Sequence, residues 1–189
     1  MPIVRVTDND PARFKRALDM GACGIMVPLV NSAAEARAAV RAMRYPPAGD
    51  RGVARTTRAT RFGRDMTEYY DTAAARLVLM VQIETAAGVA AAGDIAAVDG
   101  VDVLFVGPTD LGVALAGAPI PFDDARLAAV RQAVALSARA AGKRAGILCS
   151  TPEHVAVVRE EGFSVVMIGS DMSAAAVGVR GFAAALRPT

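Results

Sequence analysis

This sequence of 189 residues has no tryptophan, one histidine and two cysteines, and its formal net charge is only +2. Its 21 basic residues against 19 acidic ones leave no global field that would attract nucleic acid or an anionic membrane. The longest apolar runs, such as Leu77–Ile83, are too short to span a bilayer. Cys23 and Cys149 have no CxxC partner, and no secretory signal is visible after Met1. These absences predict a cytoplasmic protein without nucleic-acid or membrane partners.

Apolar residues make up 53% of the chain, which is ample for a buried core and predicts a single domain over residues 1–189. Six short runs of β-forming residues alternate with longer helical patterns. The runs are apolar on both faces, which is typical of strands in a parallel sheet. The pattern predicts an α/β fold. The expected strands are Ile3–Val6, Gly24–Val30, Leu77–Ile83, Val101–Val106, Ala145–Cys149 and Val165–Ile168.

Capping residues mark several helix boundaries. Ser32 and Glu35 form a capping-box pattern at the start of a helix that runs to Met43. Thr151 followed by Pro152 combines an N-cap with a proline at the first helical position. Further helices are expected over Ala12–Met20, Pro121–Ala141 and Ser173–Leu186.

The stretch Tyr45–Asp65 interrupts this rhythm with prolines and glycines, and a long irregular segment inside a compact domain is usually functional or disordered. Phe62 is the only aromatic residue among its arginines, which is too little stacking surface for a nucleic-acid groove. Two interpretations remain open: a clamp for a carboxylate or phosphate of a small substrate, and a solvated face with ion pairs. The arginines are Arg51, Arg55, Arg58, Arg61 and Arg64.

Two carboxylates, Glu84 and Asp110, follow consecutive expected strands. In parallel α/β folds ligands bind at the carboxyl ends of strands, so both side chains are expected at one rim. Hard oxygen ligands without a histidine or cysteine nearby suit Mg²⁺ or Mn²⁺, completed by substrate and water. The alternative is that each carboxylate only caps the helix that follows it. The spacing does not separate these two interpretations.

The remaining charged candidates are few. Arg5 lies in an otherwise apolar strand, where a cation is costly unless it meets an anion, either in an ion pair or on a substrate. Lys15 falls in a helix and Lys143 in a loop before a strand, so neither is placed to form a Schiff base. His154, in the first turn of a helix, is interpreted as an ordinary surface histidine.

Taken together, these segments resemble the metal-dependent class II pyruvate aldolases of the HpcH/HpaI type. That family includes 4-hydroxy-2-oxoheptanedioate aldolase and 2-dehydro-3-deoxyglucarate aldolase. The resemblance runs in family order over essentially the whole chain, and its most specific parts are RYPPAGDRG, VQIET and GPTDL. The other matching stretches are RATRFG, GILC and VVMIGSD.

The resemblance implies a (β/α)₈ TIM barrel, with six of the eight βα units in this chain, assembled as a homo-oligomer, a trimer or hexamer. The implied reaction is the reversible cleavage of a 4-hydroxy-2-oxo acid to pyruvate and an aldehyde, through a pyruvate enolate bound to the metal. Glu84 and Asp110 would hold the metal, Mg²⁺ or Mn²⁺, and Arg5 would stabilise the enolate.

The resemblance also assigns roles around the substrate. Gln82, Thr109 and Asp110 would contact the pyruvate part, the last two partly through backbone N–H groups. Asp19 would support the general base, and Arg58 would clamp the distal end of the substrate.

One part of the family pattern has no counterpart. The family's general base is a histidine at the end of the second barrel strand, whereas this chain is expected to begin at the third, roughly 60 residues later. His154 lies in the wrong place to substitute, so impaired activity is expected, as are two open sheet edges. Two alternatives are a non-catalytic metal- and pyruvate-binding or assembly remnant, and a citryl- or malyl-CoA lyase-like enzyme. The motif RYPPAGDRG favours the small-acid aldolases over the latter.

Overall fold

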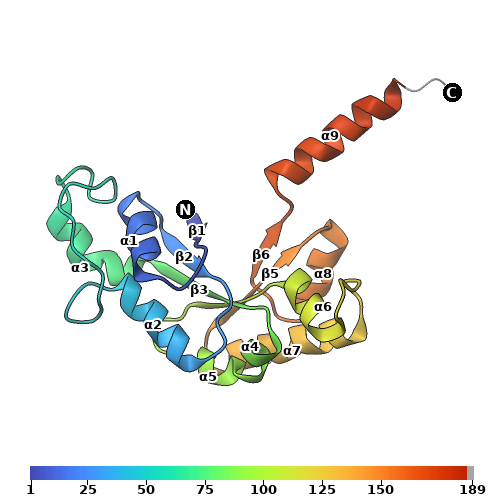
Figure 1. The fold of residues 1–189 in the computed structure, drawn as a ribbon, viewed down its shortest axis with the longest axis horizontal. Helices are drawn as coiled ribbons and strands as arrows, with labels where there is room; N and C mark the ends of the chain where they lie inside the picture. The colour runs from blue at the N-terminus through green and yellow to red at the C-terminus, as the bar shows by residue number, and fades with distance from the viewer. Residues whose placement is uncertain (187–189) are drawn as a thin grey trace.

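The computed structural model describes residues 1–186 and contains one sheet of six parallel strands in sequential order, β1 to β6. The sheet curls into a half-barrel with helices along its outer side (Figure 1). This arrangement confirms the predicted α/β fold of the TIM-barrel type. All six expected strands are present, although β2 ends three residues earlier than expected. They are β1 (Ile3–Arg5), β2 (Gly24–Val27), β3 (Val78–Ile83), β4 (Val103–Val106), β5 (Arg144–Cys149) and β6 (Val165–Ile168).

The five helices expected from the sequence are confirmed, with small shifts of their ends. They are α1 (Pro11–Asp19), α2 (Ala33–Met43), α7 (Ala125–Ala140), α8 (Pro152–Glu160) and α9 (Asp171–Ala185). α7 begins later than expected, because the side chain of Asp124 accepts a hydrogen bond from the Arg126 N–H and caps the helix there. Only half of the capping box of α2 forms: Ser32 accepts from the Glu35 N–H, but the Glu35 carboxylate accepts from the Asn31 N–H.

Four further helices had no clear signal in the sequence. They are α3 (Met66–Arg76), α4 (Ala86–Ala90), α5 (Ala92–Ala96) and α6 (Pro108–Ala116). α4 and α5 are single short turns rich in alanine, and the start of α6 looks like a turn because of Gly107 and Pro108. The segment 45–65 is irregular, as expected.

The core has two layers. The main one lies between the outer face of the sheet and the helices, where Phe14, Leu18, Ile25 and Leu104 are fully buried. A smaller cluster fills the inside of the curl, with Met26, Met80, Val103 and Phe105 as its buried members.

Both ends of the sheet are open within residues 1–186, because β1 pairs only with β2 and β6 only with β5. This agrees with the two open edges expected from the sequence. α9 points away from the body of the molecule (Figure 1) and buries none of its side chains. Over the part of the chain that the structure describes, we find no helix long and apolar enough to cross a membrane.

Candidate active site

A cavity of about 240 Å³ lies at the carboxyl ends of the strands, inside the curl of the sheet. Arg5, Gln82, Thr109 and Asp110 form its polar part. Its apolar wall consists of Met26, Phe105, Leu148 and Met167. The structure therefore brings four of the sequence-predicted residues together around one space.

A chain of hydrogen bonds orders the polar side of this cavity. Arg5 Nε donates to Gln82 Oε1 at 2.5 Å, and Gln82 Nε2 donates to Glu84 Oε2 at 3.1 Å. Gln82 and Glu84 lie two residues apart at the end of β3, so they project from the same face of the sheet. The bond from Arg5 fixes the orientation of the Gln82 amide, whose NH₂ group then points at Glu84.

Glu84 is buried, with a residue exposure of 3%. Its Oε1 accepts a hydrogen bond of 2.8 Å from the N–H of Leu29, whose backbone has a φ of 55° in the loop after β2. Burial raises the pKa of the Glu84 carboxyl. The Leu29 N–H acts in the opposite direction, the charge of Asp110 raises this pKa further and Arg5 lowers it. In the absence of a cation, ionised Glu84 is thus disfavoured by its surroundings.

Gly107 permits this arrangement of carboxylates. A Cβ atom at position 107 would lie 2.6 Å from Glu84 Oε2 and 3.0 Å from Glu84 Cβ. Only a glycine lets the end of β4 approach Glu84 so closely. α6 begins directly after it and carries Thr109 and Asp110 in its first turn, where backbone N–H groups have no partner inside the helix.

The interpretation of the two carboxylates as mere helix caps is wrong. The N-cap of α4 is Thr85, whose side chain accepts from the Gly88 N–H, so Glu84 does not cap that helix. The N-cap of α6 is Gly107, and no side chain caps it. Helix capping therefore accounts for neither carboxylate.

The residues present suit a divalent cation of the hard type. Glu84 is buried, and the negative charge of Asp110 further disfavours ionisation of its carboxyl group. A bound Mg²⁺ or Mn²⁺ would offset the repulsion between these two carboxylates. No group of three or more His, Cys, Asp or Glu side chains that could hold a metal occurs among residues 1–186. The protein would supply two ligands, and substrate and water the remainder.

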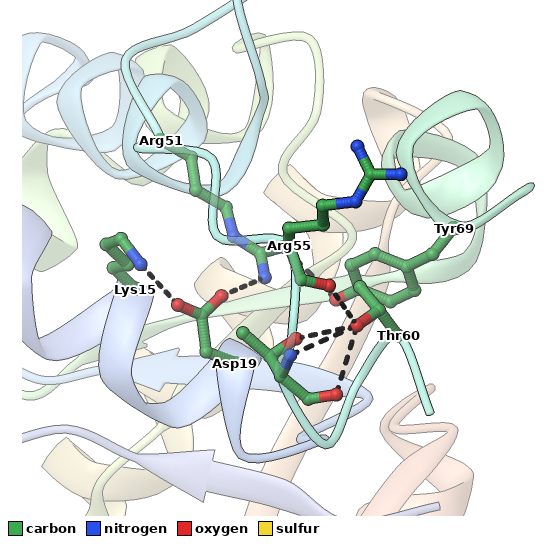
Figure 2. A network of polar contacts seen from close by, with 7 residues as sticks. Lys15, Asp19, Arg51, Arg55, Thr60 and Tyr69 are labelled. Atoms are coloured by element: carbon green, nitrogen blue, oxygen red, sulfur yellow. Dashed lines mark hydrogen bonds and ion pairs between the residues drawn. The ribbon is translucent and has the colours of Figure 1, made fainter. Parts of the chain in front are cut away.

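Asp19 lies in a separate polar cluster (Figure 2). Its Oδ1 accepts from Arg51 Nη2 at 2.8 Å, and its Oδ2 is paired with Lys15. Arg51 Nη1 also donates to the Tyr69 hydroxyl at 3.2 Å, and its guanidinium lies 4.6 Å from the centre of the Tyr45 ring. Asp19 ends α1, which returns to the start of β2, so this cluster lies at the end of the sheet opposite Glu84.

The five arginines of the irregular segment do not act as one group. Arg51 is 1% exposed, so the interpretation as a solvated face is wrong for this residue. The other four are exposed, and Arg61 pairs with Asp65. Arg58 packs beside Gly21, just before β2, and is not part of the cavity lining. The burial of Arg51 and the contact of the Leu29 N–H with Glu84 had no signal in the sequence.

Comparison with known proteins identifies the family. The profile of the HpcH/HpaI aldolase/citrate lyase family matches residues 1–177. The chain belongs to this family. The match confirms the resemblance read from RYPPAGDRG, VQIET and GPTDL.

Relatives within the HpcH/HpaI family carry aldolase names. The chain is 42% identical to a hydroxypyruvate/pyruvate aldolase of Delftia acidovorans over 91% of its own length and 64% of that protein. It is 40% identical to a 4-hydroxy-2-oxo-heptane-1,7-dioate aldolase of Salmonella arizonae over 97% of its length and 69% of that protein. The chain thus spans about two thirds of the length of these relatives.

A solved structure shares the fold of this HpcH/HpaI family member. A family protein from Burkholderia cenocepacia superposes with a TM-score of 0.91 at 34% sequence identity, covering 99% of this chain and 74% of that one. The relatives' names support membership of a lyase family.

Proposed function

We propose that this protein is a divalent-metal-dependent aldolase that cleaves 4-hydroxy-2-oxo acids reversibly to pyruvate and an aldehyde. The observation that carries the proposal is the Arg5–Gln82–Glu84 hydrogen-bond chain, which meets Asp110 around one cavity in a chain of this family. Glu84 and Asp110 would hold Mg²⁺ or Mn²⁺. Aldolase-named relatives at about 40% identity support pyruvate as the oxo-acid product.

The side chains around the cavity would have different roles in binding and catalysis. Gln82, together with the backbone N–H groups of Thr109 and Asp110, would bind the carboxylate of pyruvate and orient it. The Arg5 guanidinium would stabilise the negative charge that develops on the oxo oxygen when the methyl group loses a proton, since preorganised cations act most strongly in a partly dry site. The bound cation supplies a Lewis acid.

Neither Asp19 nor Arg58 belongs to the lining of this cavity, although Arg58 shares a neighbouring pocket with Arg5. Both lie at the end of the sheet where β2 begins, whereas Glu84 follows the opposite end of β3. We therefore propose that they act on the site of a second copy of the chain, where Asp19 would support the general base and Arg58 would clamp the distal end of the substrate. This topology supports the proposed homo-oligomer.

Within residues 1–186, the cavity lining offers no carboxylate or imidazole to take up a proton other than Asp110, one of the two proposed metal ligands. His154 is not part of this lining. We therefore propose that proton transfer is slow in this chain and that its aldolase activity is weak. The same observation favours the second candidate function, a metal- and pyruvate-binding module without catalysis.

Pyruvate binding and pyruvate deprotonation test the proposal separately. The Mn²⁺ spectrum measured by electron paramagnetic resonance should change on addition of pyruvate. Methyl-group deuterium exchange, followed by NMR, should be slow and should require Mn²⁺ or Mg²⁺. Arg5→Ala should abolish both pyruvate effects, while Arg139→Ala, at an exposed arginine of α7, should leave them unchanged.

Two results would contradict parts of this proposal. A Mn²⁺ site that responds to pyruvate equally in Arg5→Ala, with no exchange, would establish the binding module in its place. Fast metal-dependent exchange would overturn the proposed weak activity, because it requires a base supplied by a neighbouring copy or by an unrecognised residue.

The oligomer has a test of its own. α9 exposes Val177, Val179 and Phe182 and buries nothing within its own chain, so we expect it to pack on another copy. The parent protein should sediment as a trimer or hexamer, and Val177→Glu combined with Phe182→Glu should sediment as a smaller species with unchanged circular dichroism. A monomeric parent at micromolar concentration would disprove the assembly.

A further inference from the structure

The connection between α6 and α7 is held by one aromatic side chain. This connector, residues 117–124, begins at Gly117 and contains Phe122 near its end. The Phe122 ring stacks on the His154 imidazole, with ring centres 3.9 Å apart and an angle of 10° between the planes. Its other partner is the Arg131 guanidinium, 4.2 Å from the ring centre. The connector is thereby fastened to both α7 and α8.

Arg131 is itself rigidly held. It is 2% exposed, its Nε and Nη2 donate to Glu161 at 2.9 and 2.8 Å, and its Nη1 donates to the Phe122 carbonyl at 2.5 Å. A two-pronged bond to a carboxylate fixes the plane of a guanidinium. Arg131 therefore holds Phe122 both at its backbone and at its ring.

His154 contacts Phe122 through the face of its imidazole ring. Thr151 caps α8 by accepting from the His154 N–H and so places this residue in the first turn. Within the described chain, its Nδ1 atom is buried without a hydrogen-bond partner. The sequence-based interpretation as an ordinary surface histidine is therefore wrong: the side chain is half-buried and stacked.

The same connector covers the part of α6 next to Asp110. A Cβ atom at the buried Gly112 would lie 3.0 Å from Ile120 Cγ1, so Ile120 packs directly on the helix at this position. Gly112 follows Asp110 by two residues. The connector therefore packs on the middle of α6, close in sequence to Asp110.

We propose that Phe122, clamped between Arg131 and His154, is a positioning residue that fixes α6 and thereby the Asp110 carboxylate. The inference rests on the proposed function only for the role of Asp110 as a metal ligand. The clamp acts through packing and takes no part in the chemistry.

The test compares Phe122→Ala, His154→Ala and His154→Phe with the parent. Amide hydrogen exchange across α6 and residues 117–124 should become faster in Phe122→Ala and His154→Ala, and Mn²⁺ affinity should fall about tenfold. His154→Phe keeps an aromatic face and should restore both values. Leu18→Ala, at a fully buried residue of α1, is the control: it should lower the unfolding temperature without changing Mn²⁺ affinity.

Unchanged exchange in α6 of Phe122→Ala would overturn the positioning role, as would an equal loss of Mn²⁺ affinity in Leu18→Ala. If the parent protein binds no Mn²⁺, the proposed function fails. Hydrogen exchange in α6 then decides the positioning of that helix alone.

Discussion

Glu84→Gln should lower the affinity for Mn²⁺ by at least about 100-fold, because it removes one of two carboxylate ligands, and loss of even an indirect contact to a metal ligand can cost about 10–100-fold. The Glu84 pKa lies above its usual value, chiefly because the carboxyl is buried. A group with a raised folded-state pKa stabilises the fold at low pH, and this contribution is lost as the pH rises through the folded-state pKa. Gln is uncharged at every pH and avoids this loss. Without metal, Glu84→Gln should therefore be at least as stable as the parent protein near neutral pH.

Isothermal titration with Mn²⁺ and thermal unfolding with and without the metal provide the measurement. Gly107→Ala tests the same site from the end of β4. The new Cβ would lie 2.6 Å from Glu84 Oε2 and displace the carboxylate, so this variant should also bind Mn²⁺ more weakly. Asp94→Asn, an acidic residue of α5 away from the cavity, serves as the control. Undiminished Mn²⁺ binding by Glu84→Gln would rule out Glu84 as a ligand.

Arg51→Met should cost about 3–5 kcal/mol of folding free energy, the usual penalty when one member of a buried ion pair is removed. Asp19 would lose one of its two cationic partners, and Tyr69 would lose a hydrogen-bond donor. Because this guanidinium joins α1, α3 and the irregular segment, the loss should be large. Urea unfolding followed by circular dichroism measures it.

An exposed ion pair is the control for Arg51. Arg41 and Asp50 pair at 3.0 Å with exposed side chains, so Arg41→Met should cost less than about 1 kcal/mol. Should Arg51→Met fail to fold, Arg51→Lys keeps the charge but loses the planar fork, and it should show a smaller loss. Equal stability of Arg51→Met and Arg41→Met would mean that the cluster in Figure 2 does not hold the segment.

The sequence by itself determined the fold class and the edge of the sheet at which the site lies. The strands are readable because both of their faces are buried, so β-forming apolar residues run without alternation. Glu84 and Asp110 are predictable candidates because the carboxyl ends of parallel strands share one edge, whatever the helices between them do. The helix caps Ser32 and Thr151 are also predictable, because each accepts a hydrogen bond from a backbone N–H only three residues further along the chain.

Only the tertiary structure decided which distant groups meet. The Arg5–Gln82 bond depends on strand register, and the Leu29 N–H reaches Glu84 because the loop after β2 adopts a positive φ at a residue whose type does not call for one. Arg51 and His154 look like surface residues in the sequence. One is buried between tyrosines and the other is stacked on Phe122, because burial of a polar side chain is set by partners far along the chain.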